Sequence, residues 1–121
     1  MTGDSLRRSC LARPSAVEEF PFGPDTSVFK VGGKMFALTA LDARPLTVSL
    51  KCEPSLAEAL RAEHPAVRPG YHLNKRHWIT VTLDDSLPDE LVLALLEDSY
   101  ELVVDGLPKR ERELVRSRRP P

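Results

Sequence analysis

Two short apolar runs separated by a pair of glycines constrain the fold of this chain more than any other feature. Residues 28–31 and 34–39 are rich in valine, phenylalanine and leucine, and Gly32 and Gly33 stand between them. Glycine adopts the positive φ values that a tight hairpin turn requires without a steric penalty. The pattern predicts a β-hairpin over residues 28–39.

Strict alternation of apolar and polar residues predicts two further strands. In residues 46–52 the apolar positions are Leu46, Val48, Leu50 and Cys52, and the outward positions are Thr47, Ser49 and Lys51. In residues 78–83 the apolar positions are Ile79, Val81 and Leu83, and the outward positions are Trp78, Thr80 and Thr82. If both strands belong to one sheet, its outer face presents hydroxyls, one cation and one indole.

Three helices are predicted from capping and stop signals. The first is capped at Asp4 or Ser5, turns Leu6, Cys10 and Leu11 inward and ends before Pro14. The second spans residues 55–63 and begins with a capping box between Ser55 and Glu58. The third runs from residues 84–90 to about residue 104, with an expected kink near residues 99–100.

The connecting segments have weaker signals. Residues 15–24 read as an irregular segment in which Phe20 and Phe22 cover the edge of the core, and a further short strand near residues 18–22 is compatible with the pattern. In residues 67–70 the Pro69-Gly70 pair predicts a type II turn. The order of elements indicates a single α+β domain. We expect an antiparallel sheet of four to five strands with an N-terminal helix, a mid-chain helix and a long C-terminal helix on one face.

Charge divides the chain into two parts. Residues 1–108 carry 11 Lys and Arg against 16 Asp and Glu, a net charge of −5, whereas residues 109–121 carry six against two, a net charge of +4. We therefore expect a domain over residues 1–108 and a flexible basic tail over residues 109–121. Neither a signal peptide nor a membrane-spanning run is recognised, so the cytoplasm is the expected compartment.

Residue patterns that carry catalysis or bind metals are weak. Cys10 and Cys52 lack metal-finger spacing, and we expect both to be reduced, buried thiols without a disulfide. His72 and His77 are five residues apart, which places them on opposite faces of a regular strand. The carboxylates of residues 84–90 suit a helix N-terminus for electrostatic reasons, and a metal-binding role for them is the weaker alternative. The sequence indicates a protein that is not an enzyme and needs no cofactor.

Binding groups concentrate in residues 69–78, and the cations there can reach a phosphate backbone from a loop. The indole of Trp78 offers a surface on which a base can stack. Seven residues in and around this stretch are the candidate nucleic-acid contacts: Lys51, Arg68, Asn74, Lys75, Arg76, His77 and Trp78.

Four segments resemble the MmcQ/YjbR family, in order and at the family's spacing over about residues 4–109. They read FKVGGKMFA (29–37), VSLKC (48–52), PGYHLNKRHW (69–78) and SYELV (99–103). The resemblance implies an α+β fold like that of CyaY and the secretion chaperones, and it carries the family's description as DNA-binding. We therefore expect weak, phosphate-driven DNA binding through residues 68–78 and the outer sheet face, assisted by the tail. The alternative is a chaperone-like interaction module that presents the Tyr71/Trp78 side or a sheet edge to a protein or a second copy.

Overall fold

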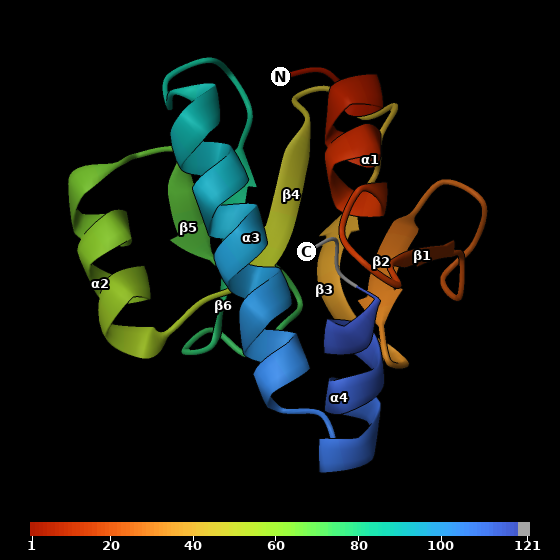
Figure 1. The fold of residues 1–121 in the computed structure, drawn as a ribbon. Coiled ribbons are helices and arrows are strands. Elements are labelled where there is room, and N and C mark those ends of the chain that lie inside the picture. The colour runs from red at the N-terminus through yellow and green to blue at the C-terminus, as the bar shows by residue number, and fades with distance from the viewer. Residues whose placement is uncertain (119–121) are drawn as a thin grey trace.

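A six-stranded antiparallel sheet carries the helices on one of its faces (Figure 1). The computed structural model describes residues 1–118. In spatial order the strands are β1 (Val17–Glu19), β2 (Ser27–Val31), β3 (Lys34–Thr39), β4 (Thr47–Lys51), β6 (Trp78–Thr82) and β5 (Val67–Pro69). The helices are α1 (Gly3–Leu11), α2 (Pro54–Glu63), α3 (Asp89–Asp105) and α4 (Lys109–Ser117). The predicted α+β class is confirmed, with one strand more than the upper limit expected.

The predicted hairpin joins β2 and β3. Gly32 and Gly33 have φ values of 58° and 78°, the left-handed conformations that the turn requires. A Cβ atom at Gly32 would also lie 2.7 Å from the end of the Leu107 side chain, which would have to move to make room for it.

One buried hydroxyl of α3 adds polar contacts to its packing against the sheet. The β3–β4 ladder pairs Ala37 with Leu50, and the next pair along this register would be Phe36 with Lys51. Instead, the Ser99 hydroxyl accepts a hydrogen bond from the Lys51 N–H (2.8 Å) and donates one to the Phe36 carbonyl (2.6 Å). Helix α3 continues without interruption through Ser99, where the sequence predicted a kink.

The core fills the space between the sheet and helices α1 and α3. Leu6 and Cys10 enter it from α1, and the residues that enter it from α3 are Val92, Leu95, Leu96, Tyr100, Val103 and Val104. The Phe36 and Tyr100 rings meet edge to face, with 5.3 Å between their centroids. The Tyr100 hydroxyl donates to the carbonyl of Pro14 (2.6 Å), so the segment after α1 is held against α3.

Two helix starts differ from the predictions. Thr2 caps α1 through a capping box with Ser5, and Leu11 is exposed rather than buried. Glu53 caps α2, where its carboxylate accepts hydrogen bonds from the Ser55 and Leu56 N–H groups. The predicted capping box at Ser55 is wrong because Pro54 occupies the first helical turn, where its fixed φ favours the start of a helix.

The Glu53 cap predicts a pH-dependent contribution to stability. Hydrogen bonds from the Ser55 hydroxyl and from the backbone N–H groups of Leu56 and Ser55 lower the pKa of Glu53 from 4.5. A carboxyl with a lowered pKa in the folded state stabilises it above the unfolded pKa, and this contribution is lost as the pH falls through the folded pKa.

We expect Glu53→Ala to lower the melting temperature at neutral pH, and the difference from wild type to shrink at about pH 3. Circular dichroism melts at both pH values measure this effect. Glu58→Ala, an exposed change in the same helix, is the matched control. A deficit for Glu53→Ala that is the same at both pH values would contradict the capping role.

Connecting segments account for the other corrections. The compatible short strand near residues 18–22 exists as β1, but Phe20 and Phe22 are 49% and 72% exposed and do not cover the core. The type II turn at residues 67–70 is wrong: β5 ends at Pro69, and the positive φ in this region belongs to His72 (57°) instead of Gly70. An edge strand tolerates proline because only one of its sides is paired.

The C-terminal segment also differs from the prediction of a flexible tail. Residues 109–117 form α4, whose Val115 is buried against the core, and Arg116 forms an ion pair with Asp105 of α3 at 2.5 Å. Residues 119–121 of the predicted tail lie outside the described residues. Within residues 1–118 no helix is long and apolar enough to cross a membrane.

Candidate binding site on the open sheet face

Strand register places one row of side chains across the face of the sheet opposite α3. The directly paired residues in this row are, from β2 to β5, Val28, Leu38, Ser49, Thr80 and Arg68. Paired residues of antiparallel strands share a face. Their neighbours Ala37, Leu50 and Ile79 belong to the core, so the row lies on the face that the helices leave open.

Hydroxyls on this face bond to one another and to the backbone. The Ser49 and Thr80 hydroxyl oxygens are 2.8 Å apart, and the Thr80 oxygen also accepts from the Tyr71 N–H (2.9 Å). Ser49, predicted to point outward, does lie on the outer face, but it is buried there. These contacts fix the start of the β5–β6 loop against the sheet.

A groove with about 1200 Å³ of open space lies over this face. We call it the open-face groove. Its floor includes Leu38, Thr47, Ser49, Arg68, Thr80 and Thr82, and its sides include Phe22, Pro45, Pro65, Tyr71, His72, Leu73, Asp84 and Ser86. The walls thus come from the β1–β2, β3–β4, α2–β5, β5–β6 and β6–α3 connections.

Two exposed aromatic side chains line the groove. Tyr71 is 68% exposed and Phe22 is 72% exposed. The rings of Tyr71 and His72 are adjacent, with centroids 4.0 Å apart. Sequence reasoning missed Phe22 as a groove residue and assigned Tyr71 only to a partner-binding side. The sequence signal that could have indicated Phe22 was a large aromatic side chain within a loop rich in glycine and proline.

The β5–β6 loop is ordered by contacts of its own. The Asn74 side-chain oxygen accepts from the N–H groups of Arg76 (2.9 Å) and His77 (3.2 Å), and the Lys75 ammonium donates to the Gly70 carbonyl (2.6 Å). A Cβ atom at Gly70 would lie 2.7 Å from the Trp78 Cβ, so only glycine fits there without a shift. The side chains of Asn74 and Lys75 therefore stabilise the conformation of the loop.

The structure distributes the seven predicted contacts over three places. Arg68 lies in the open-face groove. Asn74, Lys75, Arg76 and His77 are on the adjoining loop, with Arg76 and His77 exposed. Lys51 and Trp78 pair at the end of β4 and β6 and are not among the groove residues.

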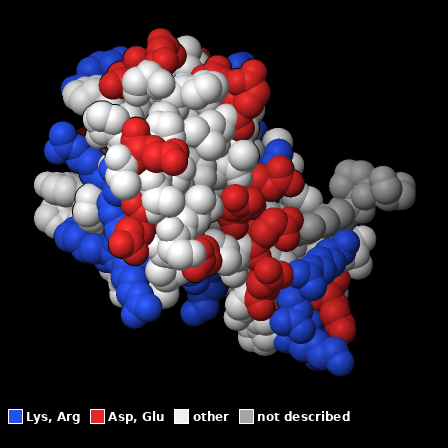
Figure 2. Space-filling model, turned by 90° about the vertical axis from the view of Figure 1, so that its left-hand side faces the viewer, with Lys and Arg blue, Asp and Glu red and all other residues white. Residues whose placement is uncertain are grey.

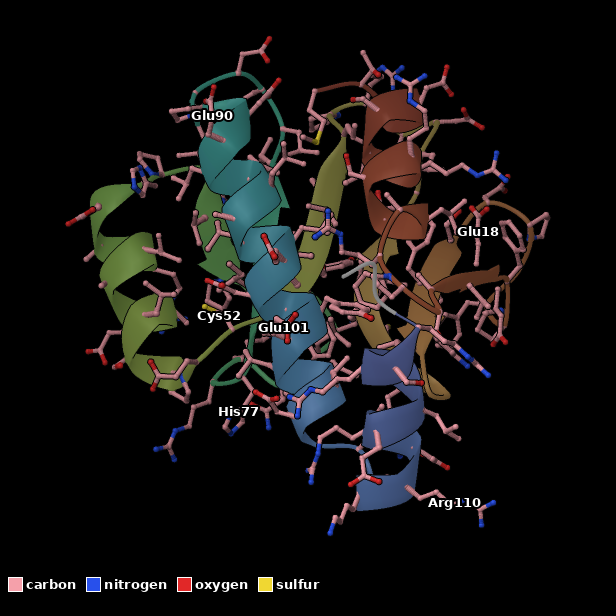
Figure 3. The ribbon with its side chains drawn as sticks, in the orientation of Figure 1. Glu18, Cys52, His77, Glu90, Glu101 and Arg110 are labelled. Atoms are coloured by element: carbon pink, nitrogen blue, oxygen red, sulfur yellow. The ribbon has the colours of Figure 1, made fainter. Side chains whose placement is uncertain are left out.

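Lys51 borders a second, smaller hollow on the other side of the sheet. This hollow holds about 200 Å³, and its acidic lining residues are Glu53, Asp98, Glu101 and Asp105. In Figure 3, Glu101 lies on the outer side of α3 and Cys52 is close to it. These carboxylates repel a phosphate from the hollow itself, whereas the β4–β6 register places the Lys51 side chain on the same sheet face as Ser49 and Thr80.

Cations and carboxylates are segregated on the surface. In Figure 2, most Lys and Arg lie along the left-hand side, which belongs to the open side of the sheet, and on α4, with some Asp and Glu among them, whereas Asp and Glu form a column along α3. Within residues 1–118 no ion pair involves Arg68, Lys75 or Arg76. One carboxylate does line the groove: hydrogen bonds from the Ser86 side chain and backbone N–H lower the pKa of Asp84.

Metal and thiol chemistry find little support in the geometry. The described residues contain no group of three or more His, Cys, Asp or Glu side chains that could hold a metal ion. Asp85 and Asp89 belong to the carboxylates for which metal binding was the weaker alternative, and each forms an ion pair with the Met1 amino group at 3.4 Å. The predicted buried, unpaired thiols are confirmed: burial raises the pKa of Cys10 to about 12 and also raises the pKa of Cys52.

The fold and the groove define a class: a small α+β protein with helices on one face of its sheet and a ligand-sized groove on the other. A family model for YjbR matches residues 11–102. The chain belongs to the YjbR family, as the sequence resemblance indicated.

Relatives and solved structures agree with this assignment. The chain is 42% identical to the uncharacterised protein YjbR of Escherichia coli K12 over 116 residues, covering 95% of this chain and 98% of YjbR. It is 38% identical to the uncharacterised protein YbdF of E. coli O157:H7 over 113 residues, 93% of each chain. A crystal structure of Deinococcus radiodurans protein DR2400, described as domain DUF419, superposes with a TM-score of 0.88 at 48% identity, covering 94% of this chain and 87% of that one. A Pseudomonas syringae protein gives 0.75 at 30% identity, covering 85% and 99%.

Proposed function

We propose that this protein binds nucleic acid through the open-face groove and the adjoining β5–β6 loop. The observation that carries the proposal is Arg68, a guanidinium at the groove floor that has no ion-pair partner within residues 1–118. A guanidinium presents several N–H donors in a geometry that matches a phosphate. Arg76 is exposed on the loop beside the groove and has no ion-pair partner among the described residues, so it can add a second phosphate contact.

The size of the groove favours a chain over a small molecule. Small-molecule sites usually have volumes of about 300–1,000 Å³. The open-face groove exceeds this range at about 1200 Å³ and is bordered by loops from several parts of the sheet. A polymer that lies across the sheet fills such a space better than a compact metabolite does.

The position of the groove favours nucleic acid over a peptide. A peptide that joins a sheet usually pairs its backbone with an exposed edge strand. Most of the groove floor instead belongs to β3, β4 and β6, which lie inside the sheet and whose backbones are paired on both sides, and only Arg68 and Pro69 come from the edge strand β5. Over the inner strands only side chains can make contacts, and a guanidinium, hydroxyls and aromatic rings suit phosphates, sugars and bases.

Binding should be weak and should depend on salt with only a shallow slope. Residues 1–108 have a net charge of −5, and Asp84 places a carboxylate at the groove. Each phosphate neutralised by a cation contributes about 0.7 to 0.9 to the slope of log K against log salt. A site with few cations therefore binds with a shallow slope and low affinity at physiological salt.

The double variant Arg68→Glu/Arg76→Glu should lose most of the binding seen at about 50 mM salt, with the salt slope falling by about 1.4 to 1.8. Fluorescence anisotropy with labelled oligonucleotides, single-stranded and duplex, measures both quantities. The matched control is Arg8→Glu/Lys34→Glu, which makes the same charge change at exposed positions of α1 and β3, away from the groove and from the basic C-terminal segment.

Equal losses in the two double variants would assign the attraction to net charge and remove the groove from the proposal. If the wild-type protein binds no oligonucleotide at about 50 mM salt, the proposal is wrong. Self-association that depends on concentration, measured by light scattering on the same sample, would then support the protein-interaction alternative.

A further inference from the structure

We infer that the open-face groove takes single-stranded nucleic acid in preference to duplex, with bases stacked on Tyr71 and Phe22. This inference depends on the proposed function and specifies its ligand. The evidence is the shape of the groove, the exposure of the two rings and the chemistry of its floor.

The shape of the site disfavours a duplex. Duplex DNA is usually read by a helix or a two-stranded ribbon that projects into the major groove. At this site the surface is hollow and is formed by strands and connecting loops. The helices of the described residues lie on the other face of the sheet (Figure 1). A double helix would contact the groove mainly at its rim, whereas a single strand can enter it.

The two exposed rings can stack against base faces, which are accessible in a single strand and covered in a duplex. Large aromatic side chains at 68% and 72% exposure leave most of their apolar surface in water. Unpaired bases have exposed faces that stack on such rings, whereas the bases of a duplex are already stacked on each other. Phe22 and Tyr71 come from different loops, so they can contact different bases of one strand.

The groove floor predicts little preference for base sequence. Base edges are read by free donors and acceptors. Here the Ser49 and Thr80 hydroxyls bond to each other, and Thr80 also accepts from the Tyr71 N–H. Arg68 remains for a phosphate, and Leu38 offers only apolar surface. Recognition should therefore depend mainly on stacking and on the backbone, with Thr47 and Thr82 as the remaining hydroxyls of the floor.

The experiment compares a labelled single strand of mixed sequence with the duplex of the same sequence, at about 50 mM salt. We expect the single strand to bind at least about tenfold more tightly, and Tyr71→Ala and Phe22→Ala each to weaken it by about 5-fold to 100-fold. Phe20→Ala is the matched control, because Phe20 is exposed in the same loop as Phe22 but does not line the groove. Tyr71→Phe should retain most of the affinity, since it keeps the ring.

The outcomes separate this inference from the proposed function. If duplex binds as tightly as the single strand and the Arg68→Glu/Arg76→Glu variant still loses binding, the inference fails and the proposed function stands. If Tyr71→Ala and Phe22→Ala bind as Phe20→Ala does, stacking in the groove is wrong. If neither form of nucleic acid binds, both proposals fall together.

Discussion

Replacing Phe36 by alanine is expected to lower the free energy of unfolding by about 3–5 kcal/mol. Phe36 is fully buried, and its ring packs edge to face against Tyr100 of α3. Its loss removes apolar contacts at the place where β3 meets the helix and leaves a cavity that the close-packed core can only partly refill. Urea denaturation followed by circular dichroism measures the change as a shift in midpoint at constant m-value.

The same substitution at an exposed position provides the control for Phe36→Ala. Phe22→Ala should change the free energy of unfolding by less than about 0.5 kcal/mol, because that ring is mostly in water. This result would also show that a loss of oligonucleotide binding by Phe22→Ala does not come from unfolding. A loss below about 1 kcal/mol for Phe36→Ala would contradict its place in the core.

The second large effect is expected from Ser99→Ala, which deletes one hydroxyl. The Lys51 N–H and the Phe36 carbonyl would both lose their partner inside the protein. A buried polar group left without a partner costs about 1–3 kcal/mol, so the two groups together should cost at least about 2 kcal/mol. Hydrogen exchange of the Lys51 amide should also become faster than in wild type, and NMR measures that rate directly.

Ser9→Ala is the matched control for Ser99→Ala. The Ser9 hydroxyl donates to the carbonyl of Ser5, four residues earlier in α1, and this carbonyl is not left without a partner by the change because it also belongs to the helix ladder. We expect an effect within about 0.5 kcal/mol. Equal small effects for the two serine variants would show that the Ser99 bridge does not hold α3 to the sheet.

Sequence patterns located the floor of the groove but not its walls. Alternation in residues 46–52 and 78–83 placed Thr47, Ser49, Thr80 and Thr82 on one outer face, where the structure has them. Phe22 and Tyr71 lie in loops, which have no periodicity to show the direction of a side chain. Their meeting around the groove depends on the paths of two connections that are about 50 residues apart in the chain.

Sequence patterns also did not show which of the candidate cations are free to bind a phosphate. Arg68, Lys75 and Arg76 are near one another in sequence, and a run of cations says nothing about which of them are already bonded. The structure shows the Lys75 ammonium bonded to the Gly70 carbonyl, Lys51 outside the groove residues and Arg68 among them. Only Arg68 and Arg76 therefore carry the charge test of the proposed function.

By itself the sequence determined the α+β class, the hairpin and the two faces of β4 and β6, because these follow from local periodicity and from glycine's conformational freedom. The tertiary structure alone decided that β6 lies between β4 and β5, that Ser99 bridges β3 and β4, and that α4 packs against the core through Val115. These features depend on contacts between residues far apart in the chain, and a local sequence pattern does not show which distant residues will meet. The open-face groove belongs to this second group, since its floor follows from periodicity but its enclosure follows from strand order and loop packing.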